Sequence, residues 1–333
     1  MKTYIMCTIS VGKIATEILC EKLNIEGIIT LNNSVGIKKT KEYYDYSEVC
    51  RKYGIKYVDM ETYDISADSD IEKINKLEID LLIVVGWQRL IPKWLIQKCR
   101  CGVIGTHGSS EGITLGRGRS PQNWALLLGK RTFFISIFWI DDGVDSGKVI
   151  ATEQFSLMET DDISISYTKV GMFVAKMILE NLDNGRISAK EGTNQESDAF
   201  YLPQRKREDG KIDWNRKSNE IYNMVRALTK PYPGAFTCYE GEEYIIWRAL
   251  PINVCHGYEE KKNGEVVCIL DEIILVKCLD GLIAIQECSS REKIVCGMVF
   301  ESVNFKHQMQ QIIDRHTLMY NTPLASEIME EAK

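Results

Sequence analysis

The chain lacks the long apolar runs that mark membrane proteins. Its 333 residues contain no stretch of the roughly 18 consecutive apolar residues needed to cross a bilayer. The N-terminus reads as a first strand and lacks the basic start, apolar core and small-residue cleavage site of a signal peptide. We therefore expect a cytoplasmic protein that does not enter the membrane.

Paired cysteines are also missing. The eleven cysteines are scattered, and none stands in a C-x-x-C pair; Cys99 and Cys101 alone lie close together. Cys7, Cys268 and Cys278 fall in apolar strand-like segments, where a buried thiol acts as a small hydrophobic side chain. Zinc sites and disulfide frameworks need regular spacings that this chain does not have. We therefore expect no metal and no disulfide.

Neither sign of charge dominates. The chain has 41 Lys and Arg against 47 Asp and Glu, for a net charge of −6. This balance excludes a global positive field for nucleic acid or anionic membranes, although it allows a local basic patch. The length is sufficient for two domains, each with its own core.

Residues 1–200 alternate between strand-like and helix-like segments. Segment 79–85 is apolar on both faces, as expected of a strand between two helix layers. A longer helix is predicted over 162–182, where apolar residues recur every three or four positions. The alternation is typical of a doubly wound, mostly parallel α/β sheet. The other predicted strands are 4–9, 27–31, 56–58, 102–106 and 133–140, and the other helices are 12–23, 47–53 and 70–77.

A polar stretch follows this α/β region. Residues 187–199 are mostly polar, and we interpret the basic run Arg205 to Arg207 as part of a solvated linker. Short strands with Gly and Asp-Gly turns come next and favour a small β-barrel. The expected domains are 1–200, 201–300 and a helical tail over 301–333. The predicted elements after the linker are helix 218–228 and strands 235–239, 244–250, 264–270, 273–277 and 282–286.

A histidine and an aspartate stand after two of the predicted strands. His107 follows one apolar strand in a glycine-rich turn, and Asp145 lies in an aspartate-rich loop after strand 133–140. Strand ends of an open parallel sheet gather ligands, and a His and an Asp brought there can form an acid–base pair. The alternatives are a half-buried histidine bonded to backbone and an aspartate that caps its own turn. We interpret Asp141 and Asp142 as solvated turn residues.

Glycine and arginine are concentrated between those two residues. Residues 116–119 could hold an anion through backbone N–H groups and guanidinium forks, or could form a flexible surface loop. Ser109 lies near His107, but no G-x-S-x-G elbow surrounds it, which disfavours a serine hydrolase. Residues 11–13 lack the spacing of a phosphate-binding loop.

Together these motifs resemble those of the folate-dependent formyltransferases, a family that includes methionyl-tRNA formyltransferase and sugar-nucleotide N-formyltransferases. In the family an N-x-H motif ends a strand, a loop ending in R-G-x-x-P follows, and a D-x-G turn supplies an aspartate. His107, residues 117–121 and residues 145–147 occupy those places here. Residues 87–92 resemble the loop that meets the folate pteridine ring, and residues 212–236 resemble the opening of the family's C-terminal domain.

The resemblance implies transfer of a formyl group from 10-formyltetrahydrofolate to an amine. His107 would stabilise the oxyanion or shuttle the amine's proton, and Asp145 would orient the imidazole and hold its charge. The resemblance further implies folate contacts from Trp87, Gln88, Arg89, Leu90, Asp141 and Gly143, and acceptor contacts from Gly105, Ser109, Arg117 and Arg119.

The chain departs from the family pattern at the asparagine of N-x-H, whose place is taken by Gly105. That asparagine donates a hydrogen bond to the oxyanion, and losing such a donor costs roughly 3 kcal/mol. A water, the Gly105 backbone N–H, Gln122 or Asn123 are the alternative donors. Residues 110–114 also differ from the family and contain a short insertion.

Three functions are consistent with these motifs. The favoured acceptor is an amino-sugar nucleotide, with Arg117 or Arg119 near its phosphates. Methionyl-tRNA is the alternative, although the loop after the histidine is short and carries Glu111 where a tRNA enzyme needs a basic, extended loop. The third hypothesis, raised by Gly105, is a catalytically silent relative that binds folate or a nucleotide sugar. A homodimer is also considered.

Overall fold

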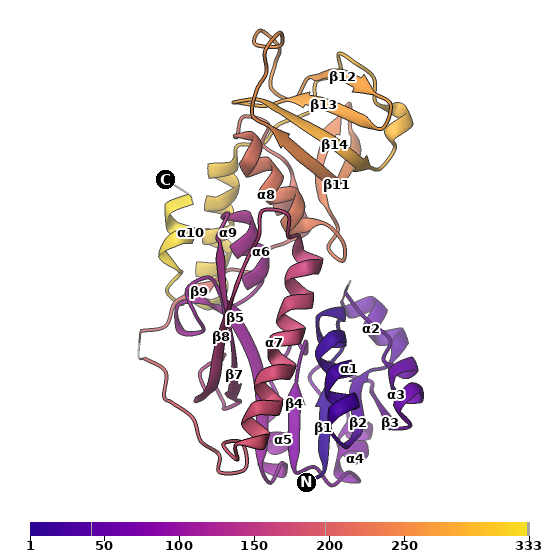
Figure 1. Ribbon diagram of the computed structural model, residues 1–333, viewed down its shortest axis with the longest axis vertical. Coiled ribbons are helices and arrows are strands. Elements are labelled where there is room, and N and C mark those ends of the chain that lie inside the picture. Colours follow the sequence, from indigo (N-terminus) through magenta and orange to yellow (C-terminus); the bar gives the residue numbers. More distant parts are fainter. Residues whose placement is uncertain (41, 197, 332–333) are drawn as a thin grey trace. The chain divides into compact units, whose positions relative to one another are not determined.

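The computed structural model describes residues 1–40, 42–196 and 198–331. The chain forms two compact units, each built on its own sheet (Figure 1). The first unit contains residues 1–117, 132–155 and 167–199, and the second contains 118–131, 156–166 and the chain from residue 200 onward. The domain limits expected from the sequence stay a prediction.

A seven-stranded sheet of order β3-β2-β1-β4-β5-β7-β8 forms the centre of the first unit. β1 lies between β2 and β4 and is parallel to both, β2 is parallel to β3, and β4 is parallel to β5, whereas β5 and β7 are antiparallel. β4 is buried along its whole length, as its uniformly apolar sequence predicts. The mostly parallel α/β sheet is therefore confirmed. The strands are β1 (Thr3–Met6), β2 (Ile25–Leu31), β3 (Lys56–Met60), β4 (Leu81–Val84), β5 (Gly102–Ser109), β7 (Thr132–Trp139) and β8 (Val149–Ser156).

Two helices of this unit pack closely against each other. α7 (Ile163–Asp183) and α1 (Lys13–Lys22) lie side by side (Figure 1). They approach at Gly171, where a Cβ atom would lie 2.8 Å from Cβ of Ile14. The long predicted helix is thus confirmed, and its apolar positions serve the core. The remaining helices of the unit are α2 (Asn33–Lys39), α3 (Ser47–Tyr53), α4 (Asp68–Asn75) and α5 (Lys93–Lys98).

The second unit contains a five-stranded antiparallel sheet of order β10-β11-β14-β13-β12, orange in Figure 1. Its core includes Phe300, whose ring centre lies 5.9 Å from that of Trp214 and 5.6 Å from that of Tyr244. The short antiparallel strands expected in the C-terminal part are confirmed. The elements are β9 (Tyr201–Leu202), β10 (Ala235–Tyr239), β11 (Glu242–Ile252), β12 (Val266–Leu270), β13 (Ile273–Lys277), β14 (Leu282–Cys288), α6 (Pro121–Leu127), α8 (Ser218–Leu228), α9 (Phe305–Tyr320) and α10 (Ser326–Glu331).

β5 is longer than the sequence predicts. It continues to Ser109, so His107 lies inside a strand, opposite Ser136 of β7, and does not follow a strand end. The glycines that suggest a turn serve a close strand approach: a Cβ atom on Gly108 would lie 2.1 Å from the carbonyl oxygen of Phe134. β8 has no counterpart among the predicted strands, because Glu and Gln interrupt its apolar pattern. Within the described residues, no helix is long and apolar enough to cross a membrane.

The basic run at 205–207 is not a solvated linker. The guanidinium group of Arg205 lies 5.0 Å from the centre of the Trp124 ring, and its Nη2 atom donates to the carbonyl oxygen of Asp209 at 2.6 Å. Burial lowers the pKa of Arg205 to about 10. The buried carboxylate of Asp209 accepts two hydrogen bonds, of 2.7 and 2.6 Å, from Nη2 of Arg315 on α9. The linker interpretation is wrong here because an arginine can stack on an aromatic ring while its charge is met by carbonyl and carboxylate groups.

Removing the Asp209 carboxylate should destabilise the second unit. Asp209→Ala leaves Arg315 without its partner and the Lys206 N–H without its acceptor. We expect a loss of about 3 kcal/mol in the free energy of unfolding, measured by urea titration. Asp314→Ala, at a neighbouring exposed position of α9, should change it by less than about 0.5 kcal/mol. Similar small changes in the two variants would contradict the anchoring role of Asp209.

Candidate active site

His107 and Asp145 face each other in the first unit. Nδ1 of His107 lies 3.4 Å from Oδ2 of Asp145, with 9% of the histidine and 21% of the aspartate side chain exposed. On the other side of the ring, Nε2 lies 2.8 Å from the carbonyl oxygen of Gly116. Because a carbonyl oxygen only accepts, Nε2 carries a hydrogen in this arrangement. The two side chains singled out by the sequence therefore lie close enough to interact, and their catalytic roles stay a prediction.

A tight turn between β7 and β8 brings Asp145 to the histidine. The N–H of Trp139 donates to the carbonyl oxygen of Lys148 at 2.9 Å. Gly147 permits this closure, because a Cβ atom on it would lie 1.6 Å from the Trp139 carbonyl oxygen. Asp145 has a φ of +50°, which is unusual for a residue other than glycine. The sequence predicts that two parallel strand ends supply the pair. This is wrong, because β7 runs antiparallel to β5. Instead, the turn after β7 directs the carboxylate back toward β5.

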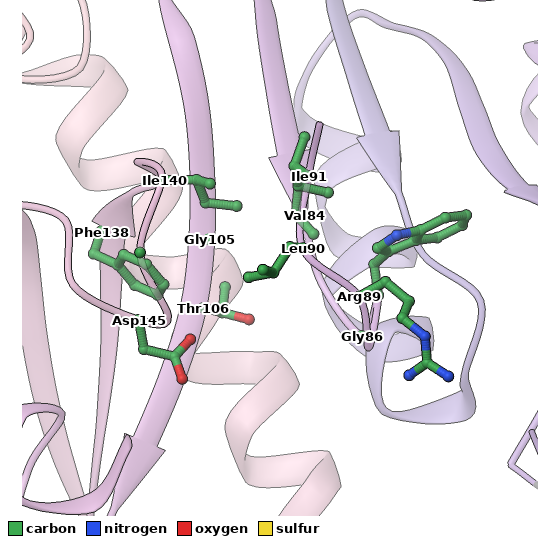
Figure 2. A pocket seen from close by; sticks show the side chains of 12 residues that line it. Val84, Gly86, Arg89, Leu90, Ile91, Gly105, Thr106, Phe138, Ile140 and Asp145 are labelled. Carbon is green, nitrogen blue, oxygen red and sulfur yellow. The ribbon is translucent and has the colours of Figure 1, made fainter. Parts of the chain in front are cut away.

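An open pocket of about 100 Å³ adjoins the pair, and Asp145 is part of its lining. Asp145, Gly105 and Thr106 lie on one side of it, with Val84 and Leu90 across from them (Figure 2). Walls that combine apolar side chains with a few convergent polar groups are typical of small-molecule sites. Thr106 is not among the candidates from the sequence. The other lining residues are Gly86, Trp87, Arg89, Ile91, Phe138, Ile140 and Gly143.

Aromatic contacts hold the loop at residues 86–92. The ring centres of Tyr63 and Trp87 lie 5.0 Å apart in an edge-to-face arrangement, and the Arg89 guanidinium lies 4.9 Å from the Tyr63 ring centre. The N–H of Gln88 donates to the Tyr63 hydroxyl at 3.2 Å. Nε1 of Trp87 is buried and has no hydrogen-bond partner among the described residues. The indole belongs to the hydrophobic core of the unit, so the loop is held by packing on this side.

The aspartates after β7 shape the turn. Oδ1 of Asp141 accepts from the N–H of Gly143 at 3.0 Å and from the Ser146 hydroxyl at 2.6 Å. Asp142 accepts from Nζ of Lys93 at 2.7 Å, and this hydrogen bond raises the pKa of Lys93. Neither aspartate lines the pocket. Four of the residues implied as folate contacts line the pocket: Trp87, Arg89, Leu90 and Gly143. The other two, Gln88 and Asp141, do not line it.

The implied acceptor residues are in different surroundings. Ser109 is 1% exposed and its hydroxyl donates to the carbonyl oxygen of Gly112 at 2.7 Å, so it stabilises a turn. Arg117, in the first unit, is buried and donates through Nη2 to Oε1 of Gln195 at 2.8 Å. Arg119, in the second unit, is half-buried, and its backbone N–H donates to the carbonyl oxygen of Leu202 at 3.1 Å. Gly105 alone of the four lines the pocket.

Gly105 has no free space beside it. A Cβ atom there would lie 2.8 Å from Cγ1 of Ile140 and 2.9 Å from Cζ of Phe138. Two apolar side chains therefore fill the place where the resembling family has an asparagine side chain. This part of the pocket wall offers no side-chain hydrogen-bond donor in place of that amide.

Gln195 is absent from the sequence-based candidates. Its Nε2 donates to the carbonyl oxygens of Asp145 and Gly147, both at 2.8 Å. Its partners lie about 50 residues earlier in the chain, and it stands in a polar stretch without periodicity. No local signal could have identified it.

Two family models match the chain in the order expected. The formyl transferase model covers residues 21–182, and the formyl transferase C-terminal domain model covers residues 205–299. Methionyl-tRNA formyltransferase of Ruminiclostridium cellulolyticum is 30% identical over 245 residues, which are 72% of this chain and 75% of that protein.

Solved structures show the same fold at lower identity. HypX from Aquifex aeolicus in complex with tetrahydrofolic acid has a TM-score of 0.61 at 20% identity, covering 88% of this chain and 45% of HypX. The N-formyltransferase from Helicobacter canadensis, in complex with folinic acid and dTDP-3-aminofucose, has a TM-score of 0.56 at 16% identity and covers 86% of this chain and 99% of that one. The two family models and the 30% identity together show that this chain belongs to the formyltransferase family.

Proposed function

We propose that this protein transfers a formyl group from 10-formyltetrahydrofolate to the amine of an amino-sugar nucleotide. The observation that carries the proposal is the contact of His107 with Asp145, whose side chain lines the pocket. An imidazole held by a carboxylate beside a small-molecule pocket is suited to proton transfer and to stabilising developing negative charge.

The lining of the pocket suits the pteridine ring of a folate. A pteridine ring is flat, with an apolar face and a hydrogen-bonding edge, and the walls combine Leu90, Ile91 and Phe138 with the polar side chains of Arg89, Thr106 and Asp145. Two solved relatives, HypX and the Helicobacter canadensis enzyme, hold tetrahydrofolic acid and folinic acid respectively. The formyl folate would supply the activated formyl carbon.

The residues of the pair then act on protons and charge. The amine nitrogen bonds to the formyl carbon, the bond from that carbon to the folate nitrogen breaks, and one proton passes from the amine to that nitrogen. With its hydrogen on Nδ1 toward Asp145, His107 accepts the amine's proton at Nε2 and passes it on; with its hydrogen on Nε2, it donates Nε2–H to the formyl oxygen as negative charge develops there. Either role requires the reacting group to replace the Gly116 carbonyl as the partner of Nε2. Asp145 stabilises the resulting imidazolium through Nδ1.

Arg117 or Arg119, which lie in different units, is the cation that supports a phosphate-bearing acceptor. Neither Arg117 nor Arg119 has an ion-pair partner among the described residues. Arg119 is half-buried, whereas Arg117 is 8% exposed. Arginine forks without a carboxylate partner suit the oxygens of a diphosphate.

Methionyl-tRNA is the second candidate acceptor, supported by the 30% identity to an enzyme of that name. Charge argues against it. Residues 235–299 contain eleven acidic and six basic residues. Two of the basic residues are paired, Lys261 with Glu265 and Lys293 with Glu242, each at 2.7 Å. Binding a polyanion depends on free lysines and arginines, which this region has in small number.

Mass spectrometry of the reaction product tests the proposal. The protein is incubated with 10-formyltetrahydrofolate, a panel of nucleotide-linked amino sugars and charged initiator tRNA. We expect one sugar nucleotide to gain a formyl group, and His107→Ala and Asp145→Asn each to lower kcat by at least about 100-fold. His256→Ala, at a fully exposed histidine, is the matched control and should keep full activity.

Other outcomes reassign the function. Formylation of the tRNA alone would establish the second candidate. No product with any acceptor, together with intact tetrahydrofolate binding, would identify a catalytically silent relative. Near-normal rates in His107→Ala would contradict the proposed role of the pair.

Restoring the family's asparagine should not improve the enzyme. Gly105→Asn places a Cβ atom against Ile140 and Phe138, and both must move into the pocket that they line. Because overpacking costs about 1–3 kcal/mol, we expect KM for 10-formyltetrahydrofolate to rise about tenfold, measured by steady-state kinetics. Ile140→Ala in the same chain should reverse much of the increase. A higher kcat with unchanged KM in Gly105→Asn would show that the wall adapts without cost.

A further inference from the structure

The Gln195 carboxamide connects the two parts of the candidate site. Its Nε2 donates to the carbonyl oxygens of Asp145 and Gly147, both at 2.8 Å, on the turn that carries the carboxylate. Its Oε1 accepts from Nη2 of Arg117 at 2.8 Å and from the Thr114 hydroxyl at 3.2 Å. The amide therefore uses both hydrogens and both oxygen lone pairs.

These partners determine the orientation of the amide. The two carbonyl oxygens only accept, and the Arg117 guanidinium only donates. A flipped amide would place its oxygen against two carbonyl oxygens and its N–H groups against a cation. A side chain that satisfies all four bonds in one orientation limits the movement of the groups around it.

The backbone near Gln195 is itself held beside the β7–β8 hairpin. Thr193 and Val149 exchange two backbone hydrogen bonds, each of 2.8 Å. The indole N–H of Trp139 donates to the carbonyl oxygen of Glu191 at 2.8 Å. The segment that carries the amide therefore lies against the same hairpin whose turn the amide binds.

The turn needs such support. Asp145 has a φ of +50°, a strained backbone conformation for a residue other than glycine. The hydrogen bonds from Gln195 restrain the carbonyl groups of residues 145 and 147, and so restrain the backbone at and just after the strained residue. Without them the turn can relax, which moves the carboxylate from its position 3.4 Å from Nδ1 of His107.

Arg117 depends on the same amide. It is 8% exposed, its Nε atom has no hydrogen-bond partner, and it has no ion pair among the described residues. Its Nη2 bond to Gln195 is thus a main restraint on a buried cation. The loop of Thr114 and Arg117 also carries Gly116, whose carbonyl oxygen contacts Nε2 of His107.

We propose that Gln195 is a positioning residue for formyl transfer. It holds the Asp145 carboxylate against His107 and keeps the Gly116–Arg117 loop in a fixed position relative to the same turn. The inference rests on the proposed roles of His107 and Asp145. It assigns no contact between Gln195 and either substrate. Its effect on the reaction passes through the turn.

A double-mutant cycle between Gln195 and Asp145 tests this role. Gln195→Ala is compared in the wild-type and Asp145→Asn backgrounds by single-turnover formylation with excess enzyme. We expect Gln195→Ala to lower the rate about 30- to 100-fold in the wild type, since a small misplacement of a catalytic group has effects of this size. In the Asp145→Asn background the further loss should be less than about threefold, because the group that the amide positions is already gone.

Two further measurements separate positioning from a general loss of structure. Tetrahydrofolate affinity, measured by calorimetry, should change less than about twofold, and the pH profile of kcat/KM should change in shape, since the contact between His107 and Asp145 is altered. Gln195→Glu keeps the shape of the side chain but has no N–H for the two carbonyl oxygens, so it should not rescue the rate. Gln154→Ala, at an exposed glutamine of β8, is the matched control and should keep the wild-type rate.

The outcomes distinguish a failure of the Gln195 proposal from a failure of the proposed formyltransferase function. Equal losses from Gln195→Ala in both backgrounds would overturn positioning through Asp145. A Gln195→Ala rate within threefold of the wild type, with Asp145→Asn inactive, would do the same and leave the proposed function intact. Full activity in Asp145→Asn would overturn both. If Gln195→Ala does not fold, the near-isosteric Gln195→Glu carries the same cycle.

Discussion

Where β7 turns back into β8, the Cα atom of Gly147 lies against the carbonyl oxygen of Trp139, with no room for a side chain between them. The hairpin can close only because of this contact, and closure directs Asp145 toward β5. The position of the carboxylate beside His107, the two carbonyl oxygens that Gln195 binds and the contribution of Gly143 to the pocket all depend on the same turn. A small backbone constraint thus determines the electrostatics of the site.

The pocket itself combines apolar packing with few polar groups. Ile140 and Phe138 close the space beside Gly105, so the polar side chains of the lining are those of Thr106, Asp145 and Arg89. With no amide at position 105, the proposed mechanism assigns the stabilisation of negative charge at the formyl oxygen mainly to His107. A low local dielectric strengthens that interaction, and the Gly116 carbonyl oxygen occupies the same donor until a substrate replaces it.

Much of the fold could be predicted from local patterns. Apolar strands such as 79–85 and the three- and four-residue periodicity of 162–182 report which faces are buried, and burial dictates the parallel sheet and α7. Predictions from the sequence were wrong where the same residue type can serve two different structural roles. The glycines around His107 suggested a turn but serve a close approach of β5 and β7, and Arg205 suggested a solvated linker but stacks on Trp124. Distinguishing these cases requires knowing the neighbouring element.

The sequence by itself determined the family, the order of its motifs and the candidates His107, Asp145 and the loop at 86–92, because those signals lie within short windows of chain. The tertiary structure alone decided which candidates meet. It separated Ser109 and Asp141, both held in their own turns, from the residues that line the pocket, and it added Thr106 and Gln195. The physical reason is distance along the chain: Gln195 and Asp145 are 50 residues apart, and only the folded hairpin brings an amide to the backbone that it holds.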